Sequence, residues 1–163
     1  MRLAADLIRS DVHFVSSDEQ ATSNSQGENR KVESIRFLPT RVHGALDYLV
    51  GLALILAPTI FQFADVGGTA VLIPRVLGVV LIVYSLLTRY EWGVVKLISM
   101  PYHLVIDFLA ALFLASSPFL FGFSNQEPNA WLPHVVVGIA VVVVVIVSKT
   151  QPGSSIATRV TTG

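Results

Sequence analysis

Four long stretches of the chain are almost free of charge, and they constrain the fold more than any other feature. They cover residues 43–63, 70–88, 101–123 and 130–148, and the last of them contains no Asp, Glu, Lys or Arg. A helix that crosses the roughly 30 Å hydrocarbon core of a bilayer needs about 20 mostly apolar residues. Only 13% of all residues are charged, against about 25% in an average soluble domain. The sequence therefore predicts an all-α membrane protein with four transmembrane helices.

The chain also contains an internal repeat with an offset of 60 residues. The offset maps one group of residues onto another: His43, Asp47, Pro58, Phe61 and Phe63 onto His103, Asp107, Pro118, Phe121 and Phe123. Each unit is a long span, a short turn and a second span. Two spans per unit give both units the same orientation in the membrane. We therefore expect two tandem two-helix repeats related by a pseudo-twofold axis along the membrane normal.

The spans divide the chain into five segments. We expect a mostly disordered N-terminal segment at 1–38, a first repeat at 39–88, an interfacial linker at 89–100, a second repeat at 101–148 and a flexible tail at 149–163. The N-terminal prediction rests on the stretch VSSDEQATSNSQGEN at 15–29, which is polar, poor in aromatic residues and without periodicity.

The distribution of Lys and Arg predicts the topology. One side of the membrane carries eight of these residues: Arg30, Lys31, Arg36, Arg41, Arg89, Lys96, Lys149 and Arg159. The other side carries only Arg75. Positive residues near spans mark the cytoplasmic side. We expect a multi-pass protein of the plasma (inner) membrane with both termini, the linker and the tail in the cytoplasm.

Two pairs, His43 with Asp47 and His103 with Asp107, are the sharpest chemical feature. Residues i and i+4 share one helix face, and a carboxylate inside a membrane is costly unless it has a partner. The favoured interpretation is a polar clamp of hydrogen bonds, within each helix or between the first and third spans. Three alternatives remain open: proton or ion handling, a divalent metal site, and axial ligation of haem. The sequence holds no cofactor-binding motif, so we expect no cofactor.

Several other residues suggest where the spans sit. Small residues such as Gly51 and Ala111 predict that the first and third spans pack at the centre, with the other two outside.

Arg75 is expected to snorkel or to meet Asp65, and His134 to do the same with Glu127. An outer anion or substrate site at Arg75 and His134 is the less favoured reading. The aromatic residues after Pro58 and Pro118 are expected at headgroup level: Phe61, Phe63, Phe119, Phe121 and Phe123.

The stretch LLTRYEWGVVKLISMPYHLVIDFLAALFLASSPFLFGF (86–123), with WLPHVVVG (131–138), resembles the SPW-repeat membrane proteins of bacteria and archaea. That family is named for a Ser-Pro-Trp in the first helix of a two-helix repeat. The corresponding residues here are Ser117-Pro118-Phe119 and Ala57-Pro58-Thr59, so tryptophan is replaced in both units. The resemblance covers about 39–150. It implies a small integral membrane protein and no particular activity.

These observations favour a structural or partner-binding membrane component, in contact with the lipid bilayer and with a membrane-protein partner or a second copy. The alternative is a small ion- or proton-coupled transport protein that uses the paired His and Asp residues. An enzyme is less favoured, because the sequence offers no nucleophile–base pair. The formal net charge of zero gives no indication of a nucleic-acid partner.

Overall fold

The computed structural model describes residues 35–151, and residues 38–151 belong to one compact unit built from helices. The long helices are α2 (Thr40–Ile60), α3 (Gly68–Leu86), α4 (Met100–Leu120) and α5 (Pro128–Val147), with a 3₁₀ turn η1 (Ala64–Val66) between the first two. The N-terminal segment and most of the tail lie outside the described residues. All four long helices are long and apolar enough to cross a membrane. The chain is therefore an all-α, multi-pass membrane protein, as the sequence predicts.

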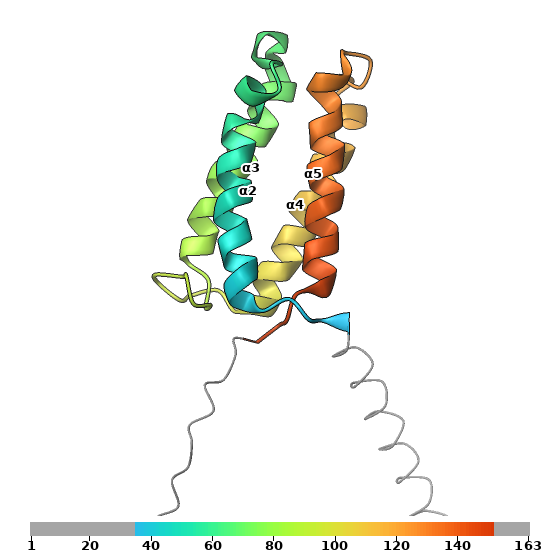
Figure 1. Ribbon diagram of the computed structural model, residues 1–163. Helices are drawn as coiled ribbons and strands as arrows, with labels where there is room; N and C mark the ends of the chain where they lie inside the picture. The colour runs from blue at the N-terminus through green and yellow to red at the C-terminus, as the bar shows by residue number, and fades with distance from the viewer. Residues whose placement is uncertain (1–34, 152–163) are drawn as a thin grey trace, which may run out of the picture. The chain divides into compact units, whose positions relative to one another are not determined.

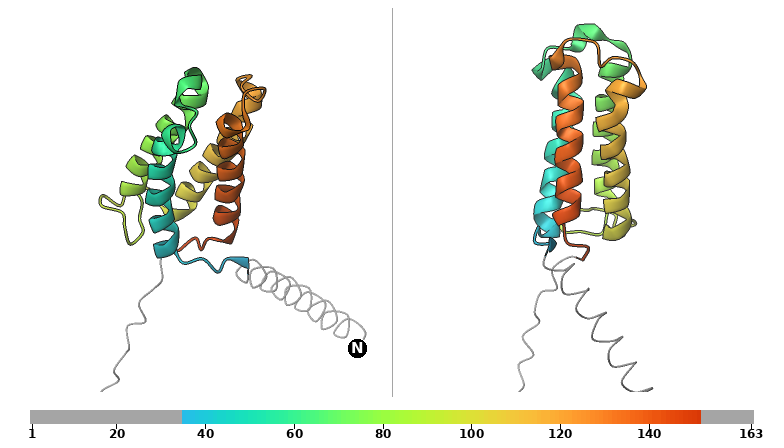
Figure 2. Two further views of the ribbon diagram at one scale, coloured as in Figure 1. Left: turned by 45° about the horizontal axis from the view of Figure 1, so that its top comes forward. Right: turned by 90° about the vertical axis from the view of Figure 1, so that its right-hand side faces the viewer.

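The helices form two hairpins, α2–α3 and α4–α5, that stand side by side (Figure 1). Both hairpin turns lie at one end of the bundle, and the linker 87–99 lies at the other (Figure 2). We call these the turn end and the linker end. Large apolar side chains are exposed on every helix, for example Leu49, Leu72, Leu109 and Val143. An outward-facing apolar surface on all sides is what a lipid environment requires.

Each helix begins one to three residues before the predicted span and ends one to three residues before its predicted end. The early ends have a local cause at the turn end. Gln62 (φ 58°) and Gly122 (φ 72°) adopt the left-handed conformation that terminates a helix. The amide of Phe63 then donates to the carbonyl of Pro58 at 2.9 Å, which satisfies an orphan helix acceptor. The Phe-x-Phe segments therefore belong to the turns and not to the spans.

The turns also decide which aromatic rings reach the core. Phe63 and Phe123 follow the left-handed residues and turn inward, with 1% and 5% of their surface exposed. Phe61, Phe119 and Phe121 remain exposed. The depth of the five aromatic residues at the headgroups stays a prediction, but Phe63 and Phe123 face the bundle, because the hydrophobic contact that closes the helix end draws them under the turn.

The closest approaches between helices occur within each hairpin. Gly51 on α2 meets Gly78 on α3, where an added Cβ at Gly78 would lie 2.5 Å from the Gly51 carbonyl oxygen. The offset of 60 maps this crossing onto Ala111 and Gly138, where a Cβ at Gly138 would lie 2.7 Å from the Ala111 oxygen. The predicted close packing of the first and third spans is therefore wrong. Their small residues serve the hairpin partner instead. These two spans are nevertheless the more buried pair, as predicted, with 39% of each buried against 28% for α3 and 22% for α5.

The backbone at the linker end repeats in the same way. The amide of Leu38 donates to Val147 O and the amide of Lys149 donates to Leu38 O, both at 2.9 Å. The residues 60 positions away form the same two bonds. The amide of Ile98 donates to Leu87 O at 2.9 Å, and the amide of Arg89 donates to Ile98 O at 2.7 Å. The entry to each repeat is thus bonded to the exit of the other. This exchange is what a twofold relation between the repeats would require, and the direction of that axis in the membrane stays a prediction.

Gly138→Ala tests the hairpin crossing. Alanine is favoured over glycine within a helix by about 1 kcal/mol, but its Cβ would force α4 and α5 apart. We expect a net loss of about 1–3 kcal/mol, typical of overpacking. The measurement is thermal unfolding in mild detergent, with Ile139→Ala on the exposed side of α5 as the control. A Gly138→Ala protein as stable as the wild type would contradict the close approach.

Candidate functional site

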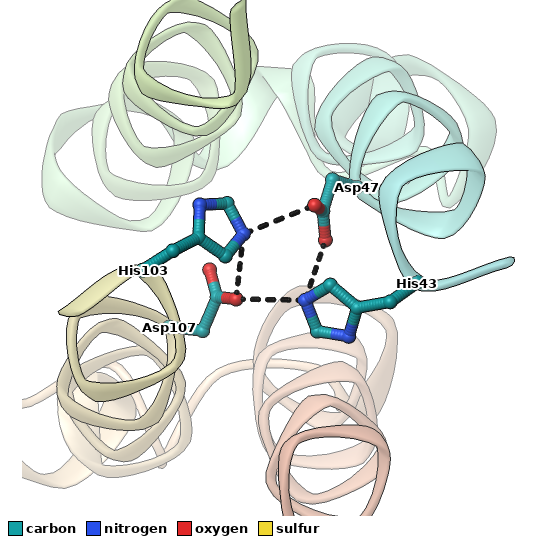
Figure 3. A group of neighbouring side chains, drawn as sticks. All are labelled: His43, Asp47, His103 and Asp107. Carbon is teal, nitrogen blue, oxygen red and sulfur yellow. Dashed lines mark hydrogen bonds and ion pairs between the residues drawn. The ribbon is translucent and has the colours of Figure 1, made fainter. Parts of the chain in front are cut away.

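The two predicted pairs meet in the interior of the bundle. His43 and Asp47 lie on the first two turns of α2, and His103 and Asp107 occupy the same turns of α4. Figure 3 shows the four helices around these side chains, with α2 and α4 at opposite corners. Because the residues of each pair share one helix face, both pairs point across the bundle toward each other. We refer to these four residues as the quartet.

Each imidazole of the quartet contacts both carboxylates. His43 Nε2 lies 3.3 Å from Asp47 Oδ1 and 3.1 Å from Asp107 Oδ2. His103 Nε2 lies 3.1 Å from Asp47 Oδ2 and 3.0 Å from Asp107 Oδ2. The exposed fractions of the four side chains run from 0% to 7%. The polar atoms are thus withdrawn from solvent and lie against one another, which links the two repeats.

Two hydroxyl groups hold the outer nitrogens of the imidazoles. Thr88 Oγ1 lies 2.8 Å from His103 Nδ1, and Ser148 Oγ lies 2.7 Å from His43 Nδ1. Each hydroxyl donates its single proton to a backbone carbonyl four residues earlier, at 2.8 Å and 2.6 Å. Each oxygen must therefore accept from the imidazole, because a hydroxyl has only one proton to give. The proton on both rings is thereby assigned to Nδ1.

One tyrosine breaks the equivalence of the repeats. The hydroxyl of Tyr84 on α3 donates to Asp107 Oδ1, and its ring lies 4.9 Å from that of His103 between centroids. The offset of 60 places Val144 at the corresponding position of α5. Asp47 therefore has no equivalent tyrosine. The two halves of the quartet share a framework but differ in their hydrogen bonds.

The linker covers the quartet at the linker end. Tyr90 is 2% exposed, and its ring lies 5.6 Å from His103 in an edge-on arrangement. The absence of a side chain at Gly44 makes room for this ring, which any Cβ there would strike. Glu91 accepts from Thr40 Oγ1 at 2.8 Å, and Trp92 Nε1 donates to Arg41 O at 2.9 Å. Burial raises the pKa of Tyr90, so a neutral phenol ring closes the site.

Sequence analysis missed Tyr84, Thr88, Tyr90 and Ser148 as parts of this site. A signal existed for two of them, because Thr88 and Ser148 are polar residues at the ends of spans and are separated by the repeat offset. The tyrosines carry no such signal. Tyr84 has an apolar counterpart, and Tyr90 lies in the segment predicted to be interfacial.

The predicted outer-face residues are not part of the quartet. His134 is 2% exposed and its Nε2 lies 3.1 Å from Ala70 O, with the ring 5.1 Å from that of Phe123. The predicted contact of His134 with Glu127 is therefore wrong, because α5 directs the imidazole into the bundle. Arg75 is exposed, and within residues 35–151 it forms no ion pair with Asp65 or any other carboxylate. Arg75 and His134 therefore differ in their surroundings, since one is exposed and the other is buried.

The repeat-motif residues lie near the turn end, away from the quartet. Ser117 is fully buried and donates to Leu114 O at 2.7 Å. Pro58 and Pro118 are buried in the last turns of α2 and α4, and their carbonyls accept the bonds that close the turns. Phe119 is 64% exposed. Ser117 follows Asp107 by ten residues, or about 15 Å along a helix, so the motif shapes the helix ends and does not touch the His and Asp side chains.

Comparison with known proteins gives one match. The family model described as the SPW repeat domain matches residues 41–148. This range contains all four long helices except the first residue of α2, and all four residues of the quartet. No curated protein and no solved structure is detectably similar to the chain.

Replacing Tyr90 tests the cover over the quartet. Tyr90→Ala removes a buried ring and should lower the free energy of unfolding by about 3–5 kcal/mol, the usual cost of deleting a buried aromatic side chain. Tyr90→Phe keeps the ring and should cost less than about 1.5 kcal/mol. Thermal unfolding in detergent measures both, and Tyr102→Ala at an exposed tyrosine is the control. Equal effects of Tyr90→Ala and Tyr102→Ala would show that the ring does not cover the site.

Proposed function

We propose that the chain, which belongs to the SPW repeat domain family, is a structural, partner-binding component of the plasma (inner) membrane with both termini in the cytoplasm. One observation carries this proposal: each aspartate of the quartet is contacted by the histidine of the other repeat. The quartet is a clamp that holds two hairpins together as one bundle. Its partners are the lipid bilayer and a membrane protein or a second copy of the chain.

The environment explains why a clamp of this kind is useful. Lipid tails are as apolar as the helix surfaces, so they supply no hydrophobic force that would hold α2–α3 against α4–α5. Contacts between the hairpins are sparser than those within them. A single polar contact between membrane helices contributes less than about 1 kcal/mol on average, but removing one partner from a buried ionic group costs about 3–5 kcal/mol. Four mutually dependent groups therefore favour the assembled bundle over separated hairpins.

Reporters fused to the chain test the orientation. A reporter after Thr150 and a reporter inserted at Gly67, in the turn between α2 and α3, should lie on opposite sides of the membrane, with the former in the cytoplasm. The physical reason is the excess of Lys and Arg at the linker end. Alkaline phosphatase and a fluorescent protein, each active on only one side, provide the measurement. Signals from the same side at both positions would contradict a four-span topology.

Replacing Asp47 tests the clamp. The protein is first treated with a chelator, so that no bound metal contributes and only hydrogen bonds are compared. Asp47→Asn retains an acceptor and a polar partner for the imidazoles and should cost about 1 kcal/mol, as the loss of one hydrogen bond does. Asp47→Leu leaves two buried imidazoles facing an apolar group and should cost about 3–5 kcal/mol. Thermal unfolding gives both values, with Asp65→Leu at an exposed carboxylate as the matched control.

The coupling between repeats is measured by a double-mutant cycle. Asp47→Leu and His103→Leu remove the two ends of one contact between repeats, so the combined loss should be smaller than the sum by more than about 0.5 kcal/mol. Strict additivity would contradict the clamp. Such a result would mean that the hairpins are held together elsewhere.

Ion- or proton-coupled transport is the second candidate function, and one observation favours it. A cavity of about 60 Å³ borders Tyr84 and Asp107, and a second cavity of about 130 Å³ borders His134 near the turn end. The two cavities share Val50, Leu54 and Leu114 in their walls. These walls are almost entirely apolar, so any ion path would depend on the few polar groups at their edges, Tyr84, Asp107 and His134. Proton or ion flux in vesicles that is abolished by Asp107→Asn would establish this function in place of the clamp alone.

A further inference from the structure

The hydrogen bonds of the quartet leave an unbalanced set of lone pairs at its centre. Both rings carry a proton on Nδ1, where Thr88 and Ser148 accept it. In a neutral imidazole the other nitrogen then has a lone pair and no proton. Both Nε2 atoms would thus direct lone pairs at carboxylate oxygens only 3.0 to 3.3 Å away. Acceptors facing acceptors repel, so these contacts are attractive only if protons or a cation lie between the atoms.

The spacing of the atoms fits a single small cation. One ligand atom from each of the four residues can be chosen so that all lie within 4.8 Å of one another. A tetrahedral ion with ligands at about 2.0 Å places neighbouring ligand atoms about 3.3 Å apart. The four nitrogen–oxygen separations in the quartet are 3.0, 3.1, 3.1 and 3.3 Å. These contacts join the two Nε2 atoms to Asp107 Oδ2 and to both oxygens of Asp47, so two nitrogens and three oxygens already surround a space of the size that one small ion fills.

The surrounding hydrogen bonds are those that metal ligands generally have. A histidine that binds a metal through one nitrogen almost always donates from the other, which fixes its tautomer and its orientation. Here Thr88 and Ser148 provide that arrangement for both rings. Tyr84 donates to the oxygen of Asp107 that faces away from the imidazoles. Three of the four candidate ligands are thus oriented by a residue outside the quartet.

A divalent cation would balance the charge of the quartet with a single group. One such ion neutralises two carboxylates within a bundle surrounded by lipid, where unbalanced charge is costly. Two added protons would give the same net charge, but each would lie in one nitrogen–oxygen contact. A single ion at the centre instead attracts all four side chains at once.

We propose that the quartet is a binding site for one divalent transition-metal ion, with zinc as the best fit, and that the ion ties the two repeats together. The assignment deepens the proposed function, on which it rests, because the metal would be the centre of the clamp. Imidazole and carboxylate ligands in a tetrahedron suit zinc. Magnesium and calcium prefer oxygen ligands in larger numbers, and two of the four ligands here are nitrogens.

Metal content is the first test, made on the full chain purified in mild detergent with an affinity tag that contains no histidine. Elemental analysis should find about one transition-metal ion per chain, as a closed four-ligand site requires. His103→Gln and Asp47→Asn should lose it. His134→Gln, at a buried histidine outside the quartet, is the matched control and should keep it. Metal retained by both quartet variants, or absent from every preparation even after zinc is added, would overturn the proposal.

Affinity is the second test, and it does not depend on variants that lack a ligand. After removal of metal with a chelator, added Zn²⁺ should raise the unfolding temperature of the wild type, and Mg²⁺ at the same concentration should not. Thr88→Val removes the acceptor of His103 Nδ1, together with the bond from Thr88 Oγ1 to Tyr84 O, and should weaken Zn²⁺ binding by about 10- to 100-fold, the typical effect of losing such a partner. Equal stabilisation by Mg²⁺ and Zn²⁺, or unchanged affinity in Thr88→Val, would argue against the site.

The two proposals fail in different ways. In one outcome, the chelated wild type is much more stable than chelated Asp47→Leu but does not respond to any transition metal. That result would support the clamp and contradict the metal site. In the other outcome, zinc binds in the quartet but Asp47→Leu does not change the stability of the chelated protein. That result would support the metal site and contradict a clamp made of hydrogen bonds alone.

Discussion

Mutual satisfaction of four buried polar side chains is the interaction on which the bundle depends. An apolar solvent penalises every polar atom without a partner, and the quartet meets this demand by bringing its imidazoles and carboxylates within 3.3 Å of one another. The contacts exist only when α2 and α4 face each other across the interior. The cost of separating them therefore acts on the whole assembly, whereas the small-residue crossings act only within a hairpin.

The internal repeat supplies the same polar pair on two helices. A His and an Asp one turn apart on one helix cannot satisfy all their lone pairs and protons alone, but the pair on a second helix provides further partners. The hydroxyl groups around the quartet also link the two repeats. Thr88 of the first repeat bonds to His103 of the second, and Ser148 of the second bonds to His43 of the first. Tyr84 is the exception, since its counterpart is valine. The quartet is thus a shared feature of two similar halves with one difference that distinguishes Asp107 from Asp47.

At the turn end of the bundle, the direction of a side chain depends on the local backbone and on contacts distant in the sequence. The sequence predicts the depth of the aromatic residues, and the left-handed residues Gln62 and Gly122 then decide that Phe63 and Phe123 lie beneath the turns. In the same region His134 points inward to Ala70 O and not to Glu127. Both orientations escape the sequence for one reason. The pattern of residues along a span gives its depth in the membrane, but not the direction in which a side chain at that depth points.

By itself the sequence determined the number, type and approximate limits of the helices, their pairing into two repeats, and the family of the chain. These properties follow from the hydropathy of about 20 neighbouring residues and from similarity at a fixed offset, so they need no information about distant contacts. Only the tertiary structure decided that the two His and Asp pairs meet, that Thr88, Ser148 and Tyr84 orient them, and that Tyr90 covers them. The physical reason is that these contacts depend on the rotation of each helix about its axis and on which helices stand at opposite corners. Both are set by the packing of all four helices together.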